Sequence, residues 1–200
     1  MYKYLYSLIV VFVLISCKEE QKLLINGYVP GNEYDGEWIY LVPFSGATNE
    51  TIDSVRITDG QFHFEKSIVK EEIAILRTRP VLRLRLQELL VVIEPGKLNV
   101  VLNEESFASG TPLNGRLQQW KERKEQMDDT ENLLRKMLKT ADDSSQVELQ
   151  RRMEKLAEEY ITYNYEFVKD NRNNELGSFI YGMIEGSLTD QQKEALDIRR

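Results

Sequence analysis

The hydrophobic pattern of the chain changes its period once, near residues 110–113. Before that point, short runs rich in Val, Ile, Leu, Tyr and Phe alternate with turn-forming pairs that contain Gly, Pro or Asp, which predicts β-strands. The expected strands are residues 23–30, 37–44, 51–58, 61–67, 72–78, 81–86, 89–94, 97–102 and 106–110. Many short strands at this spacing are typical of an antiparallel β-sandwich.

The clearest turn is Asp59-Gly60, which joins two of these runs and predicts a two-residue hairpin. The expected cross-strand pairs are Thr58 with Gln61, Ile57 with Phe62, Arg56 with His63 and Val55 with Phe64. Because side chains alternate along a strand, the pattern places both Phe residues in the core and His63 on the solvent face. His63 is the chain's one histidine, so we interpret it as a solvent-side strand residue and not as a metal ligand or a catalytic base.

After residue 113 apolar residues recur at intervals of three and four, which predicts two amphipathic helices packed as an antiparallel hairpin. Residues 140–145 interrupt the pattern, and Ser145 with Glu148 resembles a capping box for the second helix. A third helix should open at Asn173-Asn174, and a last segment should begin at Thr189, capped with Gln192. The third helix is expected to bury Phe179, Ile180, Met183 and Ile184. The predicted fold class is therefore α+β, with a β-sandwich at residues 22–112 and a helical region at residues 113–200.

The first 17 residues have the features of a lipoprotein signal peptide. Lys3 precedes an apolar run at residues 8–15, which is shorter than the roughly 20 residues that a membrane-spanning helix needs. Ser16, a small residue, lies directly before Cys17, where a signal peptidase would cut. We expect residues 1–16 to be removed and Cys17 to become the lipid attachment site, since several acyl chains on one residue give a stable membrane anchor.

Residues 17–21 are expected to form a lipidated tether. Lys18 occupies the second position of the mature chain, where Asp would resemble an inner-membrane retention signal, so the outer membrane is favoured. Lys18-Glu19-Glu20 also resembles the surface-export tag of some lipoproteins, and a solvated charged tether is an equal alternative. The predicted location is the outer membrane, at either its periplasmic face or the cell surface.

Composition excludes several classes of function. Removal of residues 1–16 takes away one charged residue, Lys3, so the formal charge of −7 becomes −8. An acidic chain is a poor candidate for binding nucleic acid, whose phosphates require a basic surface. The one cysteine, Cys17, leaves no thiol for a disulfide, a redox pair or a thiolate metal site. We therefore expect no metal and no cofactor.

Several short motifs support a family resemblance. In chain order they are Ile25-Asn26-Gly27, Trp38-Ile39-Tyr40-Leu41, Ile52-Asp53-Ser54, Asp59-Gly60-Gln61-Phe62-His63-Phe64, Ile93-Glu94-Pro95-Gly96 and Gly110-Thr111-Pro112-Leu113-Asn114. This segment, about residues 22–120, resembles the uncharacterised β-rich amino-terminal domain of lipoproteins that carry a thioredoxin-like, peroxiredoxin-related domain. The helices up to residue 197 are similar to the segment that leads into that domain. The redox motif Trp-Cys-x-x-Cys does not occur before the chain ends at Arg200, so the resemblance assigns oxidoreductase activity to no residue here.

Three other features have structural explanations that we favour. Arg77, Arg79, Arg83 and Arg85 share one strand parity, which is typical of a charged outer face, although an acidic partner or lipid phosphates are the alternative. Asp53-Ser54 resembles an O-glycosylation acceptor but also opens a strand. Paired acids such as Glu104-Glu105 could serve a hydrolase only if their two carboxyl groups lay at a defined distance, and such pairs are common in an acidic chain.

The sequence therefore predicts a non-enzymatic, lipid-anchored envelope module that binds or positions a partner, with an envelope protein as the candidate partner. The alternative is a truncated or degenerate member of the thioredoxin-like lipoproteins that lacks the redox domain.

Overall fold

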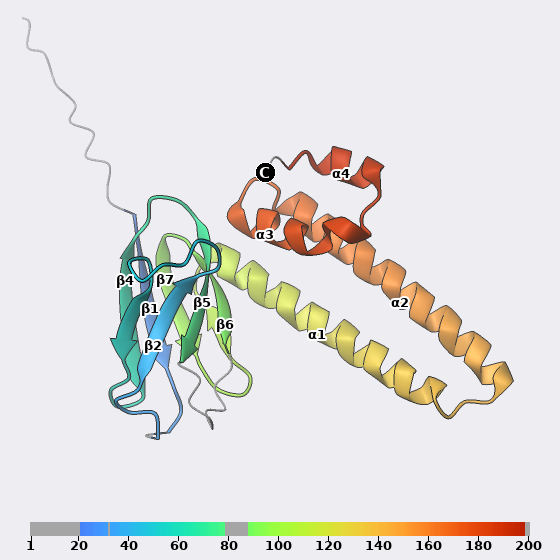
Figure 1. Cartoon of the computed structure of the whole chain (residues 1–200), viewed down its shortest axis with the longest axis horizontal. Coiled ribbons are helices and arrows are strands. Elements are labelled where there is room, and N and C mark those ends of the chain that lie inside the picture. Colours follow the sequence, from blue (N-terminus) through green and yellow to red (C-terminus); the bar gives the residue numbers. More distant parts are fainter. Residues whose placement is uncertain (1–20, 32, 79–87, 199–200) are drawn as a thin grey trace, which may run out of the picture.

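The computed structural model describes residues 21–31, 33–78 and 88–198, and it has two facing four-stranded sheets followed by helices (Figure 1). The first sheet has the order β4 (Gln61–Ser67), β1 (Lys22–Tyr28), β7 (Gly96–Val101), β8 (Phe107–Ser109). The second sheet has the order β3 (Asp53–Arg56), β2 (Trp38–Pro43), β5 (Glu72–Thr78), β6 (Leu89–Ile93). The predicted α+β class is confirmed. The strand predicted at residues 81–86 lies outside the described residues.

One strand pairing differs from the expected antiparallel sandwich. β1 and β7 are parallel, with Ile25 opposite Leu98, and the other pairings are antiparallel. Parallel neighbours need a long connection. Here the chain between them enters the second sheet twice, as β2 and β3 and then as β5 and β6, with β4 of the first sheet in between. The alternation of side chains identified the buried face of each strand but not its partner.

The Asp59-Gly60 turn forms as predicted, but the hairpin beyond it does not. Thr58 and Gln61 exchange both backbone hydrogen bonds at 2.9 Å, and Asp59 and Gly60 have φ angles of 51° and 70°. After that pair the strands separate, because β3 joins β2 in the second sheet and β4 joins β1 in the first. The predicted pairs beyond Thr58 and Gln61 are therefore wrong, since the chain crosses between sheets at this turn.

The predicted faces of these two strands are confirmed. Phe62 is 1% exposed and Phe64 is 6% exposed, whereas His63 lies on the solvent face. The Phe62 ring packs directly on Gly27 of β1, where an added Cβ would fall 1.9 Å from a ring atom. Only glycine at position 27 leaves room for this ring, so Gly27 is what allows Phe62 to pack into the sandwich core.

The helical region begins with α1 (Pro112–Leu138) and α2 (Asp143–Asp170), which form the predicted antiparallel hairpin (Figure 1). The shorter elements α3 (Glu175–Ile184), η1 (Glu185–Ser187) and α4 (Asp190–Leu196) follow. Near the sandwich, the helices cover the outer face of the second sheet. A second hydrophobic core lies between the second sheet and the helices. It contains Ile73, Val92, Leu117, Trp120, Val168, Leu176 and Ile180. Within the described residues, no helix combines the length and the apolar character that crossing a membrane requires.

The helix caps confirm two predictions and correct a third. Asn174 caps α3, and Thr189 with Gln192 forms the capping box of α4. The cap of α2, however, is Asp142, whose side chain accepts the Ser145 N–H at 2.8 Å. The expected capping box at Ser145 and Glu148 is therefore wrong. Asp is as good a cap as Ser, and Asp142 lies three residues earlier.

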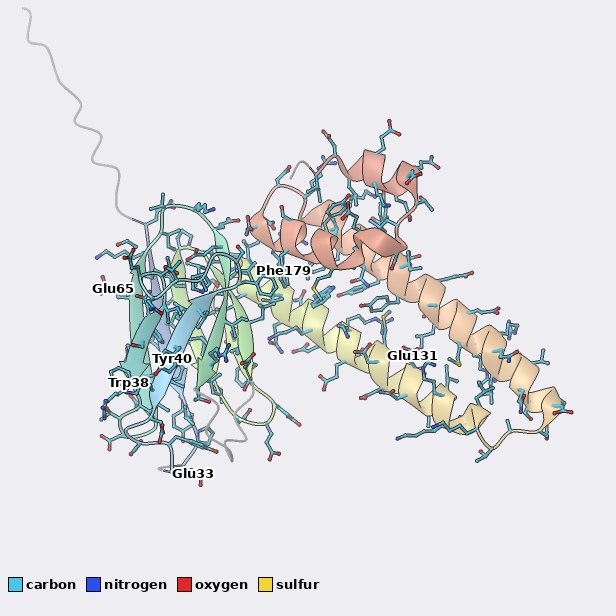
Figure 2. All side chains as sticks on the ribbon, viewed as in Figure 1. Glu33, Trp38, Tyr40, Glu65, Glu131 and Phe179 are labelled. Carbon is cyan, nitrogen blue, oxygen red and sulfur yellow. The ribbon has the colours of Figure 1, made fainter. Side chains whose placement is uncertain are left out.

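The buried face of α3 was predicted in part. Ile180 and Ile184 are buried as expected. Phe179 is half-buried and makes an edge contact with Phe44, with ring centroids 4.9 Å apart, where α3 meets the second sheet (Figure 2). Met183 is 56% exposed, so its predicted burial is wrong. Apolar residues spaced by three and four indicate which face of a helix is buried. They do not show how far along the helix the neighbouring elements extend.

Candidate functional site

A buried carboxylate joins the sandwich to the first helix. Glu94, directly after β6, is 5% exposed, and its Oε1 accepts the backbone N–H groups of Leu113 at 2.7 Å and Asn114 at 2.9 Å. Thr111, the N-cap residue of α1, makes no side-chain cap bond. Glu94 therefore satisfies the free N–H groups of the helix start and places negative charge at the positive end of the helix dipole.

Asn114 makes a second connection at the same place. Its side chain is 1% exposed, with Oδ1 accepting the Val92 N–H at 2.9 Å and Nδ2 donating to the Val92 carbonyl at 2.7 Å. β6 is an edge strand of the second sheet. The Asn114 side-chain amide therefore binds the backbone groups of Val92 as a neighbouring strand would. We call Glu94, Thr111 and Asn114 the joint. It fixes the first turn of α1 to the sheet edge.

The hairpin of α1 and α2, which we call the arm, extends away from the sandwich (Figure 1). At 1.5 Å per residue, each helix is about 40 Å long. In the half near the sandwich, Trp120 Nε1 donates a buried hydrogen bond to Asn164 at 2.8 Å, and Arg116 donates a partly buried one to Asn171 at 2.8 Å. Near the tip three apolar side chains are more than 40% exposed, namely Leu133, Met137 and Val147. The arm is therefore well packed at its base and presents apolar side chains at its tip.

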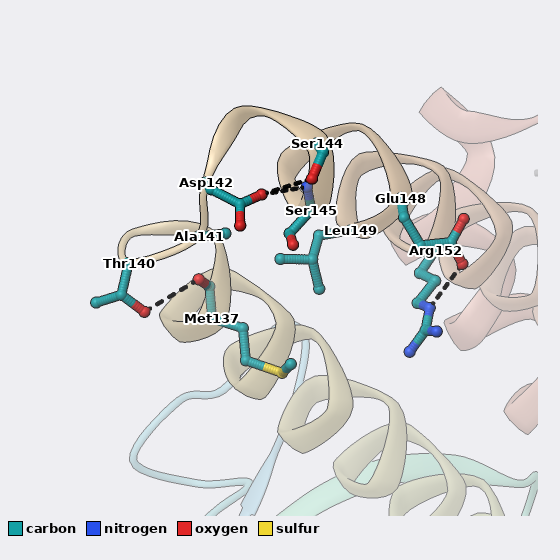
Figure 3. A pocket seen from close by; sticks show the side chains of 9 residues that line it. All are labelled: Met137, Thr140, Ala141, Asp142, Ser144, Ser145, Glu148, Leu149 and Arg152. Carbon is teal, nitrogen blue, oxygen red and sulfur yellow. Dashed lines mark hydrogen bonds and ion pairs between the residues drawn. The ribbon is translucent and has the colours of Figure 1, made fainter.

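The tip contains an open pocket of about 620 Å³ between the end of α1 and the start of α2 (Figure 3). Met137 and Leu149 supply its apolar part, and Asp142, Glu148 and Arg152 supply charged groups. Hydrogen bonds from Arg151 and Arg152 lower the pKa of Glu148 to about 2. Hydrogen bonds from the Ser145 N–H and the Ser144 hydroxyl lower the pKa of Asp142. Both groups are therefore ionised at neutral pH.

The tip pocket pairs a serine hydroxyl with a carboxylate. Ser144 Oγ donates to Asp142 Oδ1 at 2.8 Å, but the pocket lining contains no imidazole or amine that would take the proton of an attacking hydroxyl. Within the described residues, no group of three or more His, Cys, Asp or Glu side chains is arranged to hold a metal ion.

The structure separates most residues that the sequence singled out. Cys17, the predicted lipid attachment site, lies outside the described residues, as do Arg79, Arg83 and Arg85. Arg77 forms an ion pair with Glu88 at 3.3 Å, which agrees with a charged outer face.

Two of the other singled-out residues, Asp53 and His63, lie on or beside β4, whereas Glu104 and Glu105 lie between β7 and β8. Asp53 lies 3.7 Å from Lys66, so its carboxylate links the edges of β3 and β4. His63 Nδ1 lies 3.1 Å from Asn26 Oδ1 on the neighbouring strand. These residues do not converge on one site.

Sequence analysis missed the joint. Glu94 and Asn114 occur in two of the motifs on which the family resemblance rests, yet their roles were not assigned. One signal was present: a glutamate directly after the apolar strand at residues 89–93 is a candidate for burial with a specific partner. The partner itself is 20 residues away, beyond the reach of a local pattern.

Comparison with known proteins identifies the sandwich segment. Residues 23–117 match a family described as a domain of unknown function, DUF4369. The match includes the described strands and ends in the second turn of α1, so it contains the joint as well. A comparison with curated proteins gives no match, and a comparison with solved structures gives none either.

Proposed function

We propose that the protein is a lipid-anchored envelope module that binds or positions a partner and catalyses no reaction. The joint is the observation that supports this most directly. Two backbone bonds to Glu94 and two bonds between Asn114 and Val92 attach the arm to the DUF4369-like sandwich. A long arm with a buried attachment presents its tip at a defined distance from the sandwich. Residues 17–21 would tether the sandwich to the outer membrane through Cys17.

The anchor is tested by Cys17→Ala. Because the thioether at Cys17 is the one membrane attachment proposed, the variant should remain unprocessed by the lipoprotein peptidase and should not incorporate a fatty-acid analogue. Labelling in growing cells, followed by immunoprecipitation, measures this. Normal labelling of Cys17→Ala would contradict the lipid anchor.

Binding at the tip is tested by photocrosslinking in cells. A photoreactive amino acid at Leu133 or Met137 should give one discrete crosslinked product, because both side chains are exposed and apolar at the end of the arm. Val69, which is fully exposed in a sandwich loop, is the matched control and should give no such product. The same products from all three positions would argue against a binding tip.

A second candidate function is that the module serves a thioredoxin-like redox domain that is encoded separately. The motifs in residues 22–120 that resemble the amino-terminal domain of those lipoproteins favour it, and they overlap the segment that matches the domain of unknown function, residues 23–117. An adjacent reading frame with a Cys-x-x-Cys motif would support this candidate over the first.

A further inference from the structure

The second sheet carries an exposed serine on its edge strand. Ser54 lies in β3, at one edge of the sheet, and the loop that leads into this strand is exposed at residues 45–51. Among the described residues, the Ser54 hydroxyl has no hydrogen-bond partner. An edge strand of four residues opens locally at little cost in free energy, because few contacts hold it. The Ser54 hydroxyl is therefore accessible to an enzyme.

Ser54 differs from the other hydroxyl groups that follow an aspartate. The chain has three such pairs, Asp53-Ser54, Asp129-Thr130 and Asp143-Ser144. Thr130 lies within α1, and its hydroxyl donates to the Gln126 carbonyl at 2.8 Å. Ser144 lies in the first turn of α2, and its hydroxyl donates to Asp142 at 2.8 Å. Of the three pairs, the one on β3 combines an extended backbone with a hydroxyl that is not engaged by the protein.

Asp53 supplies the acid of the acceptor pattern and disfavours a charged modification. It opens β3, as the sequence indicated, and its exposed carboxylate lies 3.7 Å from Lys66. A phosphate on Ser54 would place roughly two negative charges beside this carboxylate, and like charges repel. A neutral sugar adds no such repulsion. The charge at this position therefore favours a glycan over a phosphate.

Two aromatic side chains lie beside Ser54 on the same face of the sheet. Strand register places Tyr40 of β2 directly opposite Ser54, and Trp38, which is 40% exposed, lies two residues from Tyr40 along the same strand. Both lie well away from Phe179, so α3 does not cover this part of the face (Figure 2). The negative face of an aromatic ring attracts the slightly positive C–H groups of a sugar. A sugar attached to Ser54 would therefore have aromatic rings to stack on.

We propose that Ser54 is an O-glycosylation site. The Ser54 oxygen attacks the anomeric carbon of a glycosyl diphosphate, so that a new C–O bond to serine replaces the bond to the diphosphate, which leaves. The hydroxyl proton passes to a base of the transferase, and nothing is oxidised or reduced. The attached glycan shields the open edge of β3 from pairing with a strand of another molecule. This site lies on the sandwich and does not depend on the arm or on its partner.

Mass spectrometry of the full chain, purified from its native cells, tests the proposal. Trypsin cuts after Lys22 and Arg56 and releases residues 23–56 as one peptide. This peptide should be heavier than its sequence requires by a whole number of sugar residues, and electron-transfer fragmentation should place the added mass on Ser54. Ser54→Ala should lose the added mass completely. Ser54→Thr, which keeps a hydroxyl at this position, should retain it.

Asn49→Gln is the matched control. Asn49-Glu50-Thr51 has the pattern of an acceptor for Asn-linked glycans and lies in the same peptide, yet its loss should leave the added mass unchanged. Ser144→Ala, which removes the hydroxyl of the pair on α2, should also leave it unchanged. An unmodified peptide from the unsubstituted chain would overturn the proposal. Loss of the added mass in Asn49→Gln would overturn it too, and so would a phosphate on Ser54 in place of sugar.

Discussion

Replacing Phe62 by alanine should destabilise the sandwich by about 3–5 kcal/mol, through the lost burial of the ring and the cavity that remains. Phe62 is 1% exposed and packs between Gly27 and Phe64, so the surrounding strands have little freedom to close the gap. A domain is usually stable by about 5–15 kcal/mol, so this loss is a large fraction of the total. Urea unfolding of the purified chain measures it.

His63→Ala is the matched control from the next position on the same strand. Its ring is exposed and has one contact at hydrogen-bond distance, with Asn26, so the free energy of unfolding should change by less than about 1 kcal/mol. If His63→Ala were as destabilising as Phe62→Ala, the assignment of the two faces of β4 would be wrong, because a register shift of one residue exchanges them.

Replacing Glu94 by alanine should release the arm and destabilise the protein by about 2–4 kcal/mol. The change leaves the N–H groups of Leu113 and Asn114 buried without an acceptor, and each buried donor without a partner costs about 1–3 kcal/mol. Glu105→Ala is the control, because Glu105 is an exposed glutamate at the end of β7 opposite to Glu94.

Spin-label distances test the release of the arm directly. In a Cys17→Ser background, labels at Val69→Cys on the sandwich and Asn132→Cys on the arm should give one narrow distance distribution, because the joint fixes the arm. Glu94→Ala should broaden this distribution and Glu105→Ala should not. An unchanged distribution in Glu94→Ala would show that packing on the second sheet alone holds the arm, and the positioning function would lose its main support.

Local patterns predicted most elements of this fold but few of its long-range contacts. The alternation around His63 gave the correct faces because burial acts on each strand separately. The predicted pairing of β3 with β4 was wrong. A turn sequence specifies only the pair of residues that flanks it, here Thr58 with Gln61, and not the sheet that each strand then joins. The joint was missed for a similar reason: the bonds of Glu94 and Asn114 depend on where α1 meets β6.

The parallel pairing of β1 with β7 has a consequence for the kinetics of folding. Leu23 is paired with Gly96, about 70 residues later in the chain. Folds dominated by such distant pairings form slowly, because the chain entropy of closing the loop is lost before the contacts stabilise it. The first sheet cannot be completed until β7 and β8 have been synthesised. A growing chain therefore lacks a complete first sheet until then, which suits the export that the proposed lipid anchor would require.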